Sequence, residues 1–129
     1  IPGIFTKIIK AKKNKKKYVK LWGSGNPKRE FLFVDDLADA LIFLMKKYNK
    51  SDHINIGSGK EVSILNLAKT IAKVIGFKGK FIFDKSKPDG TPRKLINSKK
   101  INSIGWKCKT DLFDGINTTY KWYLNNKSK

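Results

Sequence analysis

Residues 86–94 (Ser-Lys-Pro-Asp-Gly-Thr-Pro-Arg-Lys) combine charged side chains with residues that stiffen the backbone. The two prolines and the glycine exclude a regular helix or strand and predict an exposed loop. The loop carries Lys87, Asp89, Arg93 and Lys94. Cations on a stiff backbone can neutralise phosphate, and a carboxylate can accept hydrogen bonds from sugar hydroxyls or a base edge. The segment therefore predicts contact with a ligand that contains phosphate and sugar.

A second basic segment, residues 22–31 (Trp-Gly-Ser-Gly-Asn-Pro-Lys-Arg-Glu-Phe), has similar chemistry. Only two of the 29 basic residues of the chain are arginine, Arg29 in this segment and Arg93 in the first one. The planar guanidinium can bind a phosphate through two parallel hydrogen bonds. In a chain that otherwise uses lysine, both arginines indicate places where this geometry matters. We expect the two segments to close on one anionic ligand from two sides.

The elements that must position these loops alternate along the chain. Apolar side chains recur with helical spacing, whereas shorter apolar runs between turn residues predict strands. Ser63 and Gly76 have the residue types of a helix N-cap and C-cap, Asp35 or Asp36 is expected to cap the preceding helix, and Thr110 the last one. Helices are expected over 2–13, 37–48, 63–76, 99–104 and from 110 onward, strands over 18–22, 53–56 and 80–84, and an extended segment over 31–34. The alternation predicts an α/β fold that is part of a larger sheet.

The net charge of +19 would suit nucleic acid or an anionic membrane surface. However, lysine, asparagine and isoleucine are all abundant and share A/T-rich codons, so a coding bias accounts for the charge without a ligand. Base readout and stacking favour arginine over lysine. We therefore interpret the lysine-rich run 12–17 as a solvated helix end and turn, and we predict no specific nucleic-acid partner.

At 129 residues the chain has the length of one domain, and it opens with Ile1 rather than Met, which we interpret as a piece of a longer chain. No apolar run approaches the roughly 20 residues that span a bilayer, and no signal peptide is visible. The single cysteine, Cys108, excludes an internal disulfide and indicates a reducing, cytoplasmic setting.

Several motifs resemble catalytic or cofactor sites without completing one. The run Gly57-Ser58-Gly59 lacks the third glycine of a dinucleotide fingerprint, because Val62 stands there, so we interpret it as a strand-to-helix turn. His53 is the only histidine, which leaves no metal cluster and no obvious Cys-His dyad.

Tyr123 and Lys127 have the spacing of a reductase Tyr-x-x-x-Lys pair, but they lie in a lysine-rich C-terminal end where no pocket is expected. The aromatic residues of the C-terminal part are predicted to be core; they are Trp106, Tyr120, Trp122 and Tyr123. Cys108 is interpreted as a turn residue. Taken alone, the chain therefore contains no credible set of catalytic residues.

Four blocks of the sequence, taken together, resemble the GDP-L-fucose synthases of the extended short-chain dehydrogenase family. The block Arg29-Glu-Phe-x-x-Val-Asp-Asp36 is shared by many nucleotide-sugar enzymes, whereas Lys87-Pro-Asp-Gly-Thr-Pro-Arg-Lys94 is more particular to this group. The resemblance runs over essentially all 129 residues. The four blocks are residues 22–36, 53–59, 87–94 and 105–106.

The resemblance implies that residues 1–129 are the C-terminal, substrate-binding lobe of a Rossmann-type enzyme. Such an enzyme converts GDP-4-keto-6-deoxy-D-mannose to GDP-L-fucose by 3,5-epimerisation and 4-reduction. The family's NADPH-binding domain, its Ser, Tyr and Lys triad and its Cys and His acid/base pair all belong upstream of Ile1. We therefore expect no catalytic, cofactor or metal residue in this chain, no activity of the chain alone, and a homodimer for the full-length enzyme.

The resemblance assigns substrate binding to five positions. Trp22 corresponds to a tryptophan that packs against a sugar or base face, and Arg29 to an arginine that grips the diphosphate. Lys7 stands where the family has a basic residue, often arginine. Asp89 is expected to accept hydrogen bonds from ribose or guanine, and Lys94 to neutralise phosphate.

Two other functional interpretations stay open. One is another nucleotide-sugar enzyme of the same superfamily, such as a 4-epimerase or a 4,6-dehydratase. The other belongs to a different class, a basic nucleic-acid-binding module, which predicts a steep salt dependence and equal losses on removal of any lysine. A third possibility, that the chain is a truncated, inactive reading frame, is tested by hydrogen exchange or thermal melting, which shows whether the isolated chain folds.

Overall fold

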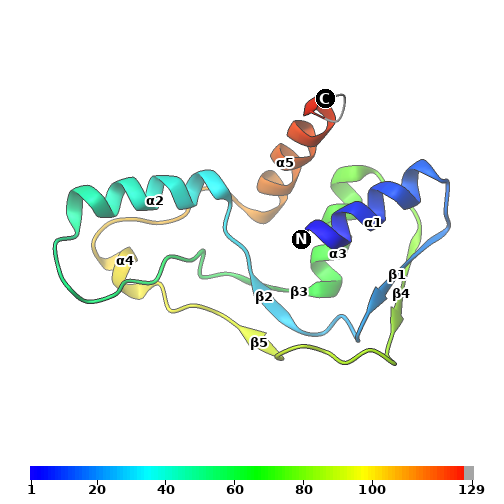
Figure 1. Cartoon of the computed structure of the whole chain (residues 1–129), viewed down its shortest axis with the longest axis horizontal. Coiled ribbons are helices and arrows are strands. Elements are labelled where there is room, and N and C mark those ends of the chain that lie inside the picture. The colour runs from blue at the N-terminus through cyan, green and yellow to red at the C-terminus, as the bar shows by residue number, and fades with distance from the viewer. Residues whose placement is uncertain (127–129) are drawn as a thin grey trace.

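The computed structural model describes residues 1–126, which form five helices and five short strands (Figure 1). The helices are α1 (Pro2–Lys13), α2 (Val34–Lys47), α3 (Ile64–Ile75), α4 (Lys99–Ser103) and α5 (Leu112–Asn126). The strands are β1 (Tyr18–Trp22), β2 (Lys28–Glu30), β3 (Glu61–Ser63), β4 (Lys80–Asp84) and β5 (Arg93–Lys94). The predicted α/β class is confirmed, although the strands make two small sheets.

Local signals fix α3 as the sequence predicts. The Ser63 hydroxyl accepts the Asn66 N–H at 3.2 Å and so satisfies a backbone donor at the helix start. Gly76 ends the helix in the left-handed conformation, at φ 74°, which glycine adopts without a steric cost. The buried face of α3 packs against α1 and α5.

The larger of two hydrophobic cores lies among α1, α3, α5 and β1, and Ile8 and Ile71 at its centre are fully buried. Phe5 meets the rings of Tyr120 and Tyr123 edge to face at 5.9 Å and 6.0 Å between centroids. A smaller core joins α2 to α4 through Ala40, Ile101 and Trp106. The prediction of a core position is confirmed for Trp106, whereas Trp122 is 65% exposed and that prediction is wrong.

Two stretches of the chain connect the two sheets. Strands β1 and β4 pair in parallel from Tyr18 opposite Lys80 to Trp22 opposite Asp84. In the other sheet, β2 pairs antiparallel with β3 and parallel with β5. Figure 1 shows that residues 18–30 and 80–94 consequently run side by side from one sheet to the other.

Two sequence-based expectations about strands fail. Residues 53–56 form no strand, and the strand that pairs with β2 lies further along the chain, at 61–63. The alternation in 53–56 instead reflects packing, since Ile54 and Ile56 contact the smaller core. The segment 86–94 is a loop except for its last two residues, which pair with β2 as β5.

The cap expected from Asp35 or Asp36 is also wrong, because α2 begins at Val34 and its N-cap, Phe33, has no side-chain bond. The buried Asp36 carboxylate instead accepts the Lys109 and Thr110 N–H groups, at 3.2 Å and 2.9 Å, and so holds the chain before α5. The α5 start is capped by Asp111, which accepts the Asp114 N–H at 2.8 Å, rather than by Thr110.

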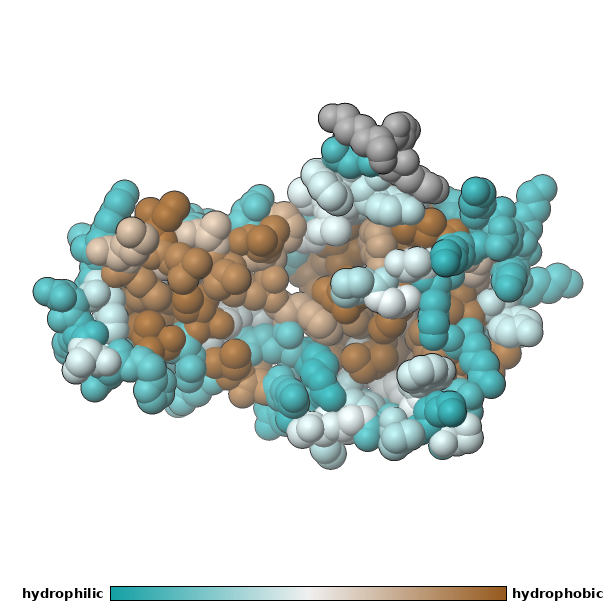
Figure 2. All heavy atoms as spheres, viewed as in Figure 1, coloured by the Kyte–Doolittle hydropathy of each residue, from teal (hydrophilic) through white to brown (hydrophobic). Residues whose placement is uncertain are grey.

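The surface has two notable regions. Figure 2 shows hydrophobic side chains gathered at the α2 end, where Leu41 and Met45 are exposed. Residues 12–17 are exposed at the end of α1 and in the following turn, which confirms the solvated-turn interpretation. Within residues 1–126, no helix has the length and apolar character that crossing a membrane requires.

Candidate ligand-binding site

The two basic segments that the sequence singles out lie against each other. The Asp89 carboxylate accepts the Ser24 N–H at 2.8 Å and the Ser24 hydroxyl at 2.5 Å. On one side of this contact, the Gly23 N–H donates to the Asp84 carbonyl at 3.0 Å, and on the other the Lys28 N–H donates to the Pro92 carbonyl at 2.9 Å. The segments are thus joined at three successive points.

The contact between Ser24 and Asp89 requires glycine beside it. Gly23 has φ 77°, and a Cβ built on it would lie 2.2 Å from Oδ1 of Asp89. Hydrogen bonds from the Ser24 hydroxyl and then from its N–H hold the pKa of Asp89 below its ordinary value. Asp89 therefore stays ionised and holds its loop down, a role that the sequence did not reveal.

Two cations stand side by side on one face of the three-stranded sheet. Arg29 pairs directly with Lys94, so their side chains share a face. Within residues 1–126 neither forms an ion pair with a carboxylate. The Arg29 guanidinium donates to the Lys28 carbonyl at 2.6 Å, and its Nη2 lies 3.2 Å from a Cβ built on Gly90. Like charges at neighbouring sheet positions repel, so this pair suits an anion between them.

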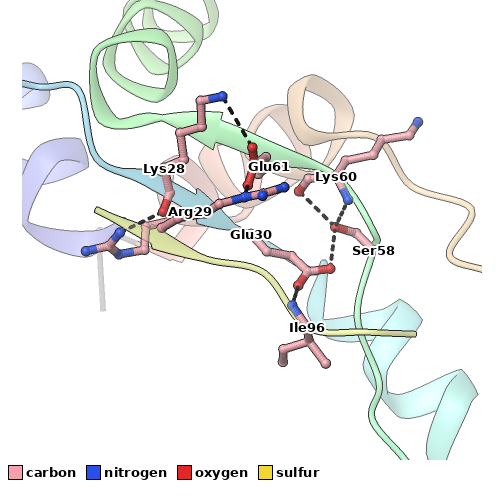
Figure 3. Close-up of polar contacts among 8 residues, drawn as sticks. Lys28, Arg29, Glu30, Ser58, Lys60, Glu61 and Ile96 are labelled. Carbon is pink, nitrogen blue, oxygen red and sulfur yellow. Dashed lines mark hydrogen bonds and ion pairs between the residues drawn. The ribbon is translucent and has the colours of Figure 1, made fainter. Parts of the chain in front are cut away.

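The opposite face of the same sheet is neutralised. Glu61 forms ion pairs with Lys28 at 3.3 Å and with Arg93 at 2.6 Å. Its pKa is lowered, first by the hydrogen bond from Arg93. Figure 3 shows Lys28 reaching Glu61 while the Arg29 guanidinium points away from it. Of the two arginines that the sequence singles out, Arg93 is held by Glu61, and only Arg29 faces the unneutralised side.

Trp22 is the last residue of β1, and 68% of its surface is exposed. Two lysine side chains lie close to its ring. The Nζ atoms of Lys7 and Lys87 lie 5.5 Å and 6.0 Å from the ring centroid. The Lys7 Nζ also donates to the Lys20 carbonyl at 3.3 Å. The structure therefore brings Lys7 and Trp22 together, and it adds Lys87, whose place beside Trp22 the sequence did not reveal.

Glu30 makes hydrogen bonds that sequence reasoning missed. Its Oε1 accepts the Gly59 N–H at 2.6 Å. The same oxygen accepts the Ser58 hydroxyl at 3.3 Å, and Oε2 of Glu30 accepts the Ile96 N–H at 2.9 Å (Figure 3). Because Glu30 already occupies the Gly59 amide, the run 57–59 does not fit a pyrophosphate. It is a turn, as interpreted, but it leads into β3 rather than directly into a helix.

The remaining candidates stay apart from this site. His53 is exposed, and the Cys108 Sγ lies 3.7 Å from the Ser58 carbonyl as a weak donor. Among residues 1–126, no group of three or more His, Cys, Asp or Glu side chains could hold a metal ion. Lys127 of the Tyr-x-x-x-Lys pair lies outside the described residues. An apolar cavity of about 220 Å³, lined by Phe5, Phe33 and Ile116 among others, contains none of the five predicted site residues.

Comparison with known proteins shows what the chain is similar to. A sequence profile of the NAD dependent epimerase/dehydratase family matches residues 2–57. Putative GDP-L-fucose synthase 2 of Arabidopsis thaliana is 52% identical over 126 residues, which cover 98% of this chain and 38% of that protein. GDP-L-fucose synthase of Escherichia coli (strain K12) is 41% identical over an alignment that covers 100% of this chain and 43% of that protein.

A solved structure supports the same assignment. The crystal structure of a GDP-L-fucose synthetase from Naegleria fowleri bound to NADP matches 99% of this chain and 40% of that chain, with TM-score 0.90 and 30% identity. The chain thus spans between 38% and 43% of the length of these curated relatives. The fold is that of a part of an extended short-chain dehydrogenase. The N-terminal part of the chain matches the NAD dependent epimerase/dehydratase family, and the chain resembles the GDP-L-fucose synthases over almost its whole length.

Proposed function

We propose that this chain is the GDP-sugar-binding part of an NADPH-dependent enzyme that converts GDP-4-keto-6-deoxy-D-mannose to GDP-L-fucose by 3,5-epimerisation and 4-reduction. The observation that carries the proposal is the pair Arg29 and Lys94 on one sheet face, within two segments that Ser24 and Asp89 hold together. Sequence likeness to GDP-L-fucose synthases over 98% of the chain supports the choice of ligand.

Each predicted residue has a role that its surroundings support. Arg29 and Lys94 bind the diphosphate, since no carboxylate among residues 1–126 forms an ion pair with either. The exposed Trp22 ring packs against a base or sugar face, with Lys7 beside it. Asp89 keeps carboxylate lone pairs for ribose or guanine in addition to the two bonds from Ser24.

The nicotinamide cofactor does not fit the residues present. The run 57–59, which most resembles a dinucleotide loop, has the Glu30 carboxylate on its Gly59 amide. A second anion there would meet a negative charge instead of a free donor. We propose that NADPH is bound elsewhere in the enzyme, that this chain alone has no reductase activity, and that the enzyme is a cytoplasmic homodimer.

Competition binding to the intact protein tests the ligand. We expect GDP to displace a fluorescent GDP analogue at lower concentration than UDP or dTDP does. Preference for UDP or dTDP would favour a 4-epimerase or a 4,6-dehydratase. Duplex DNA binding that equals GDP binding, with equal losses from every lysine variant, would favour a nucleic-acid-binding module instead.

A further inference from the structure

We propose that Glu30 is a positioning residue that holds Lys94 beside Arg29 and so shapes the anion site. The inference rests on the proposed function, because it concerns the affinity of that same site. Glu30 lies next to Arg29 in β2, and successive side chains of a strand point to opposite faces. It therefore acts from behind the sheet without neutralising the Arg29 guanidinium.

The Glu30 carboxylate joins three parts of the chain. One oxygen accepts the Ile96 N–H at 2.9 Å (Figure 3), and the other accepts the Gly59 N–H at 2.6 Å. The Ser58 hydroxyl adds a third hydrogen bond at 3.3 Å. An ionised carboxylate accepts several such bonds at once, and each is stronger than a bond between neutral groups. Glu30 thus ties β2 both to the turn before β3 and to the chain that follows β5.

The bond to Ile96 matters because β5 is only two residues long. Before the strand, the Lys28 N–H donates to the Pro92 carbonyl, and Asp89 is held by Ser24. After the strand, the Ile96 N–H donates to Glu30. So short a strand cannot keep its register without anchors at both ends. Lys94 lies between these anchors, so release of Ile96 frees it from its place opposite Arg29.

The turn on the other side of Glu30 is shaped to receive it. A Cβ built on Gly57 would lie 2.6 Å from Oε1 of Glu30 and 2.8 Å from the Ser98 hydroxyl oxygen. Such distances leave room for glycine only. Because position 57 is glycine, the backbone of the turn can pack directly against the Glu30 carboxylate, and this packing helps to fix the carboxylate in place.

A double-mutant cycle on the intact protein tests this inference, with GDP as the probe and titration calorimetry as the measurement. Glu30→Gln keeps the size of the side chain but turns an NH2 group toward one of the two N–H donors. We expect Glu30→Gln and Lys94→Met each to weaken GDP binding about tenfold, because each removes one charge-assisted contact. The double variant should bind GDP no more weakly than Lys94→Met alone, since Glu30 acts through Lys94.

Two controls keep the test decisive. Lys85→Met removes an exposed lysine just before the 86–94 loop and should leave the GDP affinity unchanged. Amide hydrogen exchange at Ile96 and Gly59 should speed up in Glu30→Gln, which shows that the ties were broken. If Glu30→Gln does not fold, Glu30→Asp serves instead, because its shorter side chain falls one methylene short of both donors.

The outcomes separate this inference from the function on which it rests. Additive losses in the double variant, or unchanged GDP affinity when exchange at Ile96 has increased, would overturn the role of Glu30 alone. Wild-type protein that does not bind GDP at all would overturn the proposed function and this inference with it.

Discussion

Ser24 and Asp89, 65 positions apart in the chain, are joined by two hydrogen bonds, from the Ser24 N–H at 2.8 Å and from its hydroxyl at 2.5 Å. This contact holds the two basic loops together. Asp89 consequently has two roles, one in holding the loop and one, under the proposed function, in meeting the ligand. The first of these can be tested without any ligand.

Replacement of Ser24 by Ala should raise the pKa of Asp89 toward its ordinary value of 3.8, because the hydroxyl bond is the largest cause of the lowering. A carboxyl whose pKa is lowered on folding contributes stability above its unfolded pKa, and this contribution is lost as pH falls through the folded pKa. The loop contact should therefore persist from neutral pH down to the ordinary carboxyl range and weaken in more acidic solution.

Titration of the Asp89 side-chain carbon by NMR measures this directly. Ser51→Ala, which removes an exposed serine hydroxyl elsewhere, is the matched control and should leave the pKa of Asp89 where it is. An unchanged pKa in Ser24→Ala would show that the contact does not form in solution.

Trp22 should report ligand binding. It is 68% exposed beside Lys7 and Lys87, so a base or sugar that covers it will change its fluorescence. We expect GDP to change the tryptophan emission of the wild type and to leave that of Trp22→Phe unchanged. Trp122, with 65% exposure on α5, provides the control, since Trp122→Phe should keep the response. A response that survives in Trp22→Phe would place the nucleotide elsewhere.

Much of the fold follows from signals a few residues apart. The Ser63 cap, the left-handed Gly76 and the apolar spacing of α3 predict that helix within one residue at each end. Pairing between distant segments has no such local signal, and so the two sheets were not predicted. The alternation of 53–56 shows why, because it reports which side chains are buried and not whether a neighbouring strand exists.

The sequence likewise predicted some residues of the candidate site but not how they are arranged. Residue types identified Arg29 and Asp89 as groups suited to a phosphate-containing ligand, whereas Trp22 was assigned through the family resemblance. The register that sets Arg29 opposite Lys94, and Glu61 against Arg93, depends on strand pairing, which the sequence left open. Glu30 and Ser24 were missed because both bind backbone or side-chain groups far away in the sequence.

Gly57→Ala should destabilise the protein. The added Cβ would lie 2.6 Å from the Glu30 carboxylate, so either the turn or Glu30 must move. Overpacking of this kind costs about 1–3 kcal/mol in the free energy of unfolding. Urea denaturation measures the change. Gly3→Ala is the control, since nothing lies within 4 Å of its Cβ and alanine favours the α1 helix. Equal stability of Gly57→Ala and wild type would contradict the close packing of Glu30.

Replacement of the two arginines should have different effects, because Arg29 is expected to bind the ligand and Arg93 to stabilise the fold. Arg29 faces the unneutralised side of the sheet, so Arg29→Ala should weaken GDP binding about tenfold or more through loss of a charge-assisted contact. Arg93 is held by Glu61 on the other face, so Arg93→Ala should lower the melting temperature while GDP binding changes less than threefold by the same reasoning. Titration calorimetry and thermal unfolding of both variants, with Glu61→Gln as the partner of Arg93, distinguish the roles. Equal losses of GDP affinity in Arg29→Ala and Arg93→Ala would mean that the charge of the segment matters and its register does not.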